Sequence, residues 1–480
     1  LKRLSRIIKR NNIDLQFVLS SATIANPEEF SRRLIGRRVK VIVGKGRRSR
    51  LSVLFLYTAD PPFRAVARIL AELVNSGIKT LAFLNTRSSA ELAYNIVKRV
   101  RNKKIRNMIE LHRAGLPAHT RINIEKNFKK DIIIGLLSTP TLELGIDIGG
   151  VSAVVTALTP VDRFIQRSGR AGRRDKPGAA ILVLRADDPI SEYYVTNPSE
   201  YFKDITGRFL EPNNRYIAKK HIYLMAYESA LTMRDVEYYN LPKDVIHELE
   251  RERGLFRTTD GWIANGVLFH KYFSRNIRGI DIQIDVYHKG RRIDRREILL
   301  ALKELYPGAI YLNRGTKYIV TELDIEKKRA TVVRAPEDHK YYYTKPLYTY
   351  GAIPIGELDK KNSCGTIVFH GQLMMSLSVW GYLVFKEGSR KPITQRELEK
   401  EIKYEYPTFG LFFRAPTPEY TSEDDIAGSY HATEHILIEG TYRISGGSEY
   451  DLGGISYGTT GLIVIHDCLL YTSPSPRDRG

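Results

Sequence analysis

Residues 166–173 read QRSGRAGR, and residues 138–148 shortly before them read STPTLELGIDI. The first stretch places three arginines and two glycines within eight residues. Arginine carries a permanent charge on a planar fork and glycine permits a tight backbone, so the octet suits an anionic ligand such as a triphosphate. A solvated basic turn can have the same sequence. The neighbouring segments are therefore needed to choose between a phosphate-binding segment and a solvated turn.

The chain around these stretches alternates between helical and strand-like patterns. This rhythm predicts an α/β fold with a parallel sheet that is covered by helices on both faces, and it places each motif in a loop after a strand. Helical spacing of apolar residues occurs over 66–74, 88–101 and 121–129, and strand-like runs occur over 80–84, 109–112, 132–137, 153–157 and 179–184.

The N-terminal residues predict a basic helix over 4–8, a buried strand over 16–19 and a helix that starts at Pro27. After 207 the alternation stops. Helices over 216–228 and 245–253 and a hairpin over 255–263 fit a winged-helix module, although a small helical linker would also fit. Short strands then predict a β-rich domain, over 281–287, 309–312, 318–323, 330–333, 366–370 and 379–385.

Composition favours a polyanionic partner. The chain has 75 Lys+Arg against 54 Asp+Glu, a net charge of +21 and a pI near 9.6. This surplus of positive charge favours nucleic acid as the partner, bound along a basic stripe. For many of these residues, a solvated helix face without a partner is the alternative. No apolar run reaches the length of about 18 residues of a membrane helix and no signal peptide is recognised, so we expect no membrane contact and a cytoplasmic location. The two cysteines, Cys364 and Cys468, are too few for a disulfide framework or a cysteine-rich zinc site.

Four segments match, in order and spacing, motifs III to VI of superfamily 2 helicases of the DEAD/DEAH-box type: 21–23 (SAT), 83–87 (FLNTR), 138–148 and 166–173. The segments 187–189, 211–214, 306–312, 432–439 with His435, and 451–456 further resemble the MrfA-type DNA helicases. The resemblance implies an α/β, RecA-like helicase fold followed by a winged-helix-like module and a β-rich C-terminal domain. Its expected boundaries are 1–50 for the end of RecA-like domain 1, 51–62 for a linker, 63–210 for RecA-like domain 2, 211–265 for the winged-helix-like module, 266–467 for an incomplete β-rich domain, and 468–480 for a tail.

The resemblance also implies site residues. Arg170 and Arg173 would be arginine fingers on the transferring γ-phosphate of ATP, and Gln166 would contact that phosphate or the attacking water. The remaining roles are Asp147 on the ribose, Gly145 at the nucleotide, Thr86, Arg87 and Thr139 on phosphates of a nucleic-acid strand, and Ser21 and Thr23 in coupling between the two RecA-like domains. His112 either touches nucleic acid or is a buried histidine at a strand end.

Two departures from the family pattern are visible. The phosphate-binding G-x-x-x-x-G-K-[ST] loop and the Asp-Glu-x-His motif do not occur before residue 21 or elsewhere, and 44–46 (GKG) lacks the hydroxyl that binds Mg²⁺. We therefore expect the Mg²⁺ ligands in a missing N-terminal part, no metal site in this chain, and no counterpart of the family's cysteine cluster. Residues 468–480 (CLLYTSPSPRDRG) resemble translated sequencing-adapter sequence, with a genuine disordered tail as the alternative.

Three hypotheses follow. The intact protein is an ATP-dependent, Mg²⁺-requiring DNA helicase or translocase, for which 3′→5′ polarity and a role in DNA repair are implied by the family. An RNA-directed DEAD-box-like helicase is the alternative within the same class. The 480-residue chain by itself would be a non-catalytic nucleic-acid-binding fragment.

Overall fold

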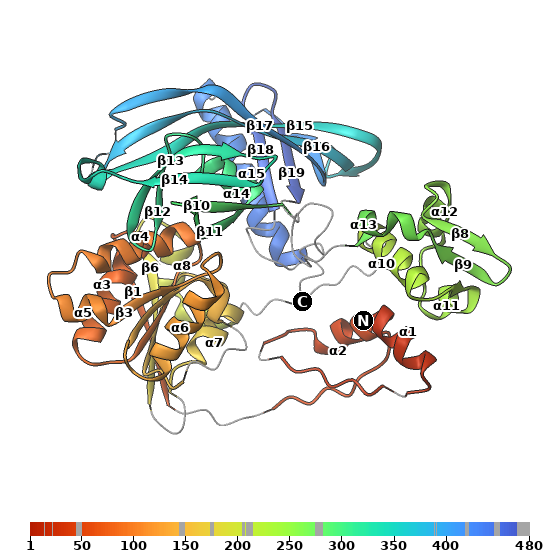
Figure 1. Ribbon diagram of the computed structural model, residues 1–480, viewed down its shortest axis with the longest axis horizontal. Coiled ribbons are helices and arrows are strands. Elements are labelled where there is room, and N and C mark those ends of the chain that lie inside the picture. The colour runs from red at the N-terminus through yellow and green to blue at the C-terminus, as the bar shows by residue number, and fades with distance from the viewer. Residues whose placement is uncertain are drawn as a thin grey trace.

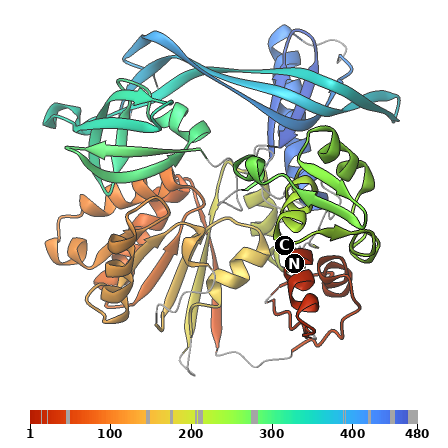
Figure 2. The ribbon, with the colours of Figure 1, turned by 45° about the vertical axis from the view of Figure 1, so that its right-hand side comes forward.

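The computed structural model describes residues 1–13, 15–21, 23–44, 50–143, 149–172, 177–203, 207, 215–273, 282–387, 389, 391–417, 422–445 and 452–467. Four groups of elements follow one another along the chain: an N-terminal helical segment, a parallel-sheet unit, a small module of helices and a hairpin, and a β-rich domain (Figures 1 and 2). No membrane-spanning helix is found among the described residues. The expected tail over 468–480 lies outside them.

The parallel-sheet unit has six strands in the order β1-β6-β5-β2-β4-β3, and every neighbouring pair is parallel. The expected α/β fold class is therefore confirmed. The strands are β1 (Leu51–Thr58), β2 (Thr80–Phe83), β3 (Ile109–His112), β4 (Gly135–Ser138), β5 (Ala153–Ala157) and β6 (Gly178–Arg185). The helices are α3 (Pro62–Asn75), α4 (Arg87–Lys98), α5 (Lys103–Asn107), α6 (Ala118–Lys129), η1 (Pro140–Leu142), α7 (Val161–Ser168), α8 (Pro189–Thr196) and α9 (Pro198–Lys203).

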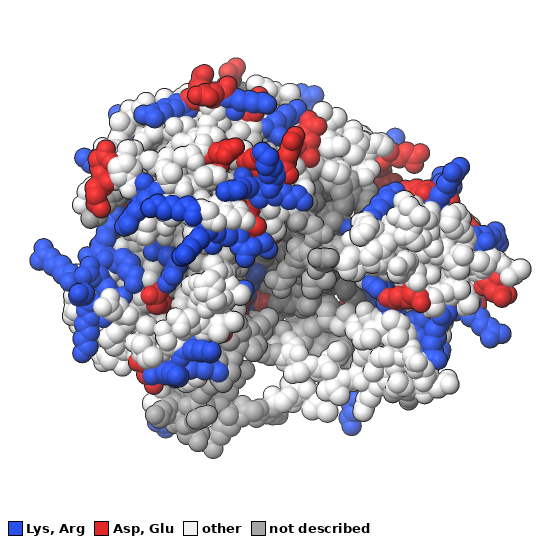
Figure 3. All heavy atoms as spheres, viewed as in Figure 1, with Lys and Arg blue, Asp and Glu red and all other residues white. Residues whose placement is uncertain are grey.

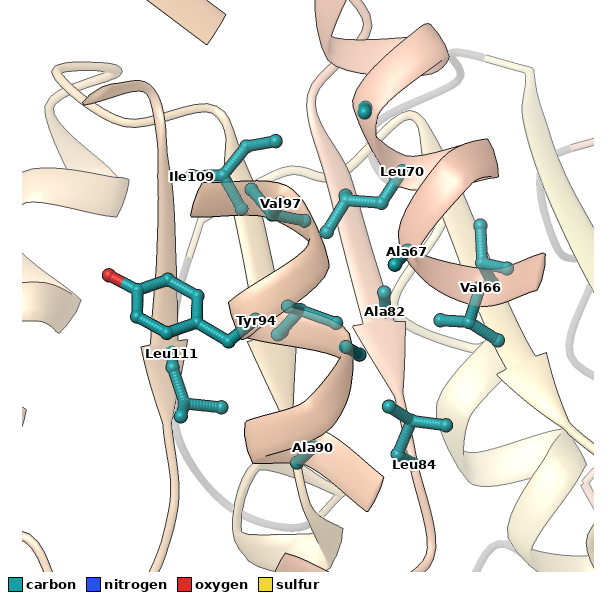
Figure 4. Close-up of a cluster of buried hydrophobic side chains, with 14 of the residues drawn as sticks. Val66, Ala67, Leu70, Ala82, Leu84, Ala90, Tyr94, Val97, Ile109 and Leu111 are labelled. Carbon is teal, nitrogen blue, oxygen red and sulfur yellow. The ribbon is translucent and has the colours of Figure 1, made fainter. Parts of the chain in front are cut away.

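Both faces of this sheet are buried from β2 to β6, which explains the nearly continuous apolar residues of these strands, whereas the edge strand β1 is largely exposed. In β2 and just beyond it, Ala82 and Leu84 point to one face and Leu81 and Phe83 to the other, as the period of two requires. The first face packs on α3 and α4, as the close-up in Figure 4 shows for Val66, Leu70, Tyr94 and Val97. The carboxyl ends of all six strands consequently meet at one edge, where loops can carry a site.

Two expectations at the start of the chain are wrong. Residues 16–19 form no strand, and Val18 is 85% exposed. A strand needs a hydrogen-bonding neighbour, and the described part of the chain places none beside these residues. The linker expected over 51–62 is also corrected, because β1 pairs along its full length with β6, from Leu51 with Gly178 to Thr58 with Arg185.

The N-terminal helix α1 (Lys2–Arg10) packs on the module of helices and a hairpin; the next helix is α2 (Pro27–Ile35). Arg6 is 1% exposed, donates to the main-chain oxygens of Met225 and Ala230 at 2.7 and 2.5 Å, and pairs with Asp235 at 2.9 Å. Arg3 and Arg10, one helical turn away on either side, pair with Glu228 and Asp235. These cations of the basic N-terminus therefore hold two parts of the chain together.

The described residues of the module form four α-helices, a short 3-10 helix and a three-stranded antiparallel sheet of order β7-β9-β8. Thr232 and Asp235 form a capping box that starts its second helix. This arrangement matches the winged-helix-like expectation better than a simple helical linker does. The elements are α10 (Arg215–Glu228), β7 (Leu231–Thr232), α11 (Met233–Tyr238), α12 (Lys243–Arg251), β8 (Leu255–Thr258), β9 (Gly261–Ala264), η2 (Gly266–Leu268) and α13 (Phe269–Tyr272).

The β-rich domain is built from two five-stranded sheets that share a core. The first has the order β11-β10-β14-β13-β12, and its strands are β10 (Gln283–His288), β11 (Arg291–Glu297), β12 (Ile310–Asn313), β13 (Thr316–Asp324) and β14 (Arg329–Arg334). Helix α14 (Ile298–Glu304) lies between β11 and β12 in the chain, and η3 (Glu337–Tyr341) follows β14. The second has the order β15-β16-β17-β19-β18, and its strands are β15 (Tyr342–Ser363), β16 (Thr366–Lys386), β17 (Thr394–Arg414), β18 (Leu452–Tyr457) and β19 (Leu462–Asp467). Helix α15 (Glu423–Ser445) lies between β17 and β18 in the chain.

The expected strands over 366–370 and 379–385 are wrong as separate elements, because both belong to the 21-residue strand β16. Small residues such as Gly371 and Ser376 interrupt its apolar pattern and suggest a break. Pairing with β15 and β17 nevertheless continues through this stretch, since each partner supplies backbone hydrogen bonds where side chains give no signal.

A buried ion-pair cluster joins the β-rich domain to the parallel-sheet unit. Arg113 has no exposed side-chain surface, and it contacts Glu91 at 2.7 Å and Asp294 at 2.8 Å. Tyr311 and Asn313 also donate to Asp294. Burial alone would raise the pKa of Asp294, but the charges of Arg113 and Arg296 hold the pKa below its usual value. We name Glu91, Arg113 and Asp294 the interdomain clamp.

Candidate nucleic-acid and nucleotide interface

Thr86 and Thr139 lie in the loops after the neighbouring strands β2 and β4, at the carboxyl edge of the sheet, and Arg87 is the first residue of α4. Thr86 is exposed and is the N-cap of α4, where its hydroxyl accepts a hydrogen bond from Ser89 N at 3.1 Å. The N-terminal N–H groups of α4 and the Arg87 guanidinium favour negative charge here. Thr139, in contrast, is 4% exposed and precedes η1 at its N-cap position without a capping hydrogen bond from its side chain. The structure thus brings the three residues expected on strand phosphates to one edge.

Arg87 also reaches the β-rich domain. Its Nη1 donates to the main-chain oxygen of Arg295 at 3.1 Å. Burial lowers the pKa of Arg87, and the nearby charge of Arg296 acts in the same direction. Arg87 therefore lies where the sheet edge meets the β-rich domain.

Gln166 and Arg170 lie at the C-terminal end of α7. Gln166 is half-buried on the helix, and Arg170 follows its C-terminal residue Ser168. Gly172 N donates to Val151 O at 3.1 Å, which places this end of the motif beside the start of β5. Arg170 is 8% exposed, and its Nη2 donates to Glu143 O at 2.7 Å. The guanidinium therefore packs against its own unit in this conformation, and its role as an arginine finger stays a prediction.

Three expected nucleotide residues, Gly145, Asp147 and Arg173, lie outside the described residues. Of the expected ATP contacts, the described residues offer Gln166 and Arg170, and Arg170 is engaged with Glu143. A triphosphate also needs a cradle of N–H groups and an Mg²⁺ ligand. Within the described ranges these residues fit only the edge of an ATP site, and no step of hydrolysis follows from them.

Arg167, which has no role in the sequence interpretation, is the central contact of the site. It is fully buried, and it contacts Glu143 Oε1 at 2.7 Å, Thr156 Oγ1 at 2.6 Å and Asn85 Oδ1 at 3.1 Å. Its guanidinium also lies 5.0 Å from the centre of the Phe83 ring. Complete burial lowers the pKa of Arg167, and Glu143 partly offsets this effect. One side chain thus joins the loops after β2 and β4 to helix α7.

His112 resembles a buried strand-end histidine more than a nucleic-acid contact. It is 1% exposed, and its ring nitrogens lie 3.2 Å from Thr141 Oγ1 and 2.9 Å from Glu125 Oε1. Burial lowers the pKa of His112, although Glu125 opposes the effect. Both polar atoms of the ring are therefore already used within the unit.

Ser21 and Thr23, expected to couple two RecA-like domains, form a local turn in the N-terminal segment. Ser21 Oγ accepts from Thr23 N at 3.3 Å and donates to Thr23 O at 3.2 Å. Thr23 is 8% exposed, and its hydroxyl finds no hydrogen-bond partner in the described part of the chain. Their coupling role stays a prediction.

Sequence reasoning could have found Arg167 from its place on α7. Val161, Phe164 and Ser168 follow the spacing of a buried helix face, and Arg167 falls on the same face. A cation there requires an acid, and Glu143 in the preceding motif is within the expected loop. Arg113 had no such signal, because its partner Asp294 is 181 residues away.

Comparisons with known proteins agree with this architecture. A family model described as the helicase conserved C-terminal domain matches residues 63–175. The uncharacterized ATP-dependent helicase MJ1574 of Methanocaldococcus jannaschii is 30% identical over 384 residues, which cover 77% of this chain and 53% of that protein. The ATP-dependent helicase HRQ1 of Saccharomyces cerevisiae is 28% identical over 471 residues, 89% of this chain and 42% of that protein. The chain spans about half the length of the curated relatives it matches.

The fold is also similar to that of a solved structure of the DUF1998 helicase MrfA bound to DNA. The TM-score is 0.78 at 23% identity, and the match covers 98% of this chain and 65% of the other. Residues 63–175 match the helicase conserved C-terminal domain, and the parallel sheet and the relatives agree with the resemblance to superfamily 2 helicases. The likeness in fold to MrfA agrees with the resemblance found in the sequence.

Proposed function

We propose that the complete protein carrying this sequence is an ATP-dependent DNA helicase or translocase. The observation that supports this most is the Arg167 network, which joins the expected nucleic-acid loops to the helix that precedes Arg170 and Arg173. A buried guanidinium with three fixed partners resists independent movement of those partners. A displacement of α7 on nucleotide binding would therefore move the loops that hold the strand.

In this proposal the strand lies across the carboxyl edge of the parallel sheet, where Thr86, Arg87 and Thr139 bind its phosphates. ATP binds between two RecA-like units, with Gln166, Arg170 and Arg173 on the phosphates and Asp147 at the ribose. Arg170 would have to exchange Glu143 O for phosphate when the units close. Domain closure and opening would then pull one strand, and the 3′→5′ polarity and the repair role are proposed from the resemblance. The cytoplasmic location expected from the sequence stays a proposal.

The 480-residue chain alone is proposed to bind DNA without hydrolysing ATP, because it contains no G-x-x-x-x-G-K-[ST] loop and no Asp-Glu-x-His motif. Purified chain should bind a fluorescent oligonucleotide and release no phosphate above background. Turnover that disappears in an Arg173→Ala variant would overturn the inactive state proposed for this chain.

For the complete protein, the test is strand separation on DNA and RNA duplexes of matched sequence, each with a single-stranded tail. The expected result is ATP-dependent unwinding of DNA, and a preference for RNA would favour the DEAD-box-like alternative. Arg173→Ala should abolish ATP hydrolysis and leave DNA binding largely unchanged. Full hydrolysis in that variant would refute the finger assignment.

A further inference from the structure

The outer face of the first β-rich sheet carries basic side chains that the proposed site does not use. Strand β10 lies between β11 and β14, and the register sets Asp285 opposite both Arg295 and Arg329. A shallow cavity of about 540 Å³ opens on this face. We name as the basic face five residues that line this cavity, Tyr287, Arg295, Lys327, Lys328 and Arg329.

These cations are available to a ligand. Lys327, Lys328 and Arg329 are exposed, and Arg295 is 46% exposed. Asp285 is the acid in the cavity lining, and its Oδ1 accepts from Arg295 Nε at 2.7 Å, which fixes the direction of that guanidinium. Lys327 pairs with Asp324 at 2.9 Å. An exposed pair of this kind contributes about 1 kcal/mol or less, so a phosphate can replace the carboxylate.

The face also combines charge with an aromatic ring. The Arg329 guanidinium lies 4.5 Å from the centre of the Tyr287 ring, and Tyr287 is only half-buried. Cations that follow a backbone beside an aromatic side chain are typical of surfaces that bind single-stranded nucleic acid without sequence preference.

The basic face continues directly from the proposed strand site. Arg87 donates to the main-chain oxygen of Arg295, whose side chain lies on the basic face. The interdomain clamp holds the two domains together, so this continuity does not depend on one exposed contact. Figure 3 shows Lys and Arg side chains gathered where the β-rich domain meets the parallel-sheet unit. A strand that passes Thr86 and Arg87 would next meet this surface.

We propose that the basic face is a second binding surface for the same DNA strand, and that Arg295, Lys327, Lys328 and Arg329 contact its phosphates. The proposal rests on the proposed function, because it needs a strand at the sheet edge. It lengthens the strand that the protein holds, and it gives the β-rich domain a part in retaining DNA while the sheet-edge contacts are released. Affinity should therefore depend on strand length.

The experiment measures fluorescence anisotropy of labelled oligodeoxythymidines of about 6 and about 20 nucleotides, one near the lower end and one above the usual range of single-strand site sizes. The test variant is Lys327→Gln/Lys328→Gln/Arg329→Gln. The matched control is Arg396→Gln/Lys400→Gln/Lys403→Gln, which removes three exposed charges from β17. Titrations at about 50 and 200 mM salt give the number of phosphates neutralised.

The wild type should bind the long oligonucleotide more tightly than the short one. The test variant should lose about tenfold or more in affinity for the long strand, with a salt slope shallower by about 2, because each phosphate contact contributes about 0.7 on single strands. Its affinity for the short strand and both affinities of the control should equal those of the wild type. Circular dichroism melting of both variants checks that the exposed substitutions leave the fold intact.

The proposed strand site at the sheet edge and the proposed basic face can be refuted separately. If the wild type binds neither oligonucleotide, the proposed function of the sheet edge is wrong. If the wild type binds both and the test variant binds the long strand as well as the control does, only the basic face is refuted.

Discussion

Removal of Arg113 should separate the two large domains, because this side chain neutralises two carboxylates that water cannot reach. In an Arg113→Met variant, Glu91 and Asp294 keep 2% and 0% of their side-chain surface exposed and lose their main cation. Breaking a buried pair in this way costs about 3–5 kcal/mol. For a domain of this size that corresponds to a fall of roughly 6–20 °C in the melting temperature.

The matched control is Arg99→Met, which removes a half-exposed pair with Glu387 from the same interface. This pair should contribute about 1 kcal/mol or less. Scanning calorimetry of both variants compares the two costs. Equal losses for Arg113→Met and Arg99→Met would refute the claim that burial gives the clamp its strength.

The pH dependence gives a second readout. In the wild type the pKa of Asp294 is lowered, so its contribution is present at neutral pH and is lost only in acid, below the usual carboxylate range. Without Arg113, burial would raise the pKa of Asp294, and protonation would relieve the unpaired charge. The stability difference between variant and wild type should therefore shrink from about pH 8 to about pH 5. A difference that stays constant would contradict this reasoning.

Three further outcomes are expected. Arg6→Met should release α1 and expose its backbone amides to hydrogen exchange, whereas Arg3→Met, which removes a more exposed ion pair, should not. Equal protection of the α1 amides in the two variants would refute the role of Arg6. Arg167→Met should cost about 3–5 kcal/mol in thermal unfolding, since Glu143 is left buried without its cation, and an unchanged melting temperature would contradict the network. His466 is buried with a pKa lowered to about 4, so the wild type should lose about 3 kcal/mol as the pH falls from about 6.5 to 4. His466→Gln should flatten that acid loss, and an unaltered pH profile would show that another group titrates.

Local patterns predicted the parallel-sheet unit well for a physical reason. Strands buried on both faces, such as 153–157, need uninterrupted apolar residues, and the structure has β5 over the same residues. The pattern over 16–19 looks equally convincing, yet no neighbouring strand is described to complete it. In β16, pairing continues through Gly371 and Ser376, where side chains carry no strand signal.

The residues of the candidate site also differ in how far the sequence could place them. Thr86 and Thr139 could be placed at one edge because parallel strands end together. The contacts of Arg167 could be inferred only in part, from helix spacing, and those of Arg113 with Asp294 not at all, because they join separate domains. Motifs predict which residues meet a ligand, whereas buried ion pairs between distant segments depend on the folded arrangement.

The most direct test of the central claim is the affinity of the purified chain for single-stranded DNA when the sheet edge is altered. Arg87→Gln removes the half-buried cation at the sheet edge that joins the proposed strand site to the β-rich domain, and Arg68→Gln, on the exposed face of α3, is the control. We expect Arg87→Gln to weaken binding of both short and long oligonucleotides and to reduce the salt slope by about 0.7, while Arg68→Gln binds as the wild type does. Binding by Arg87→Gln that equals the control at every salt concentration would contradict the account.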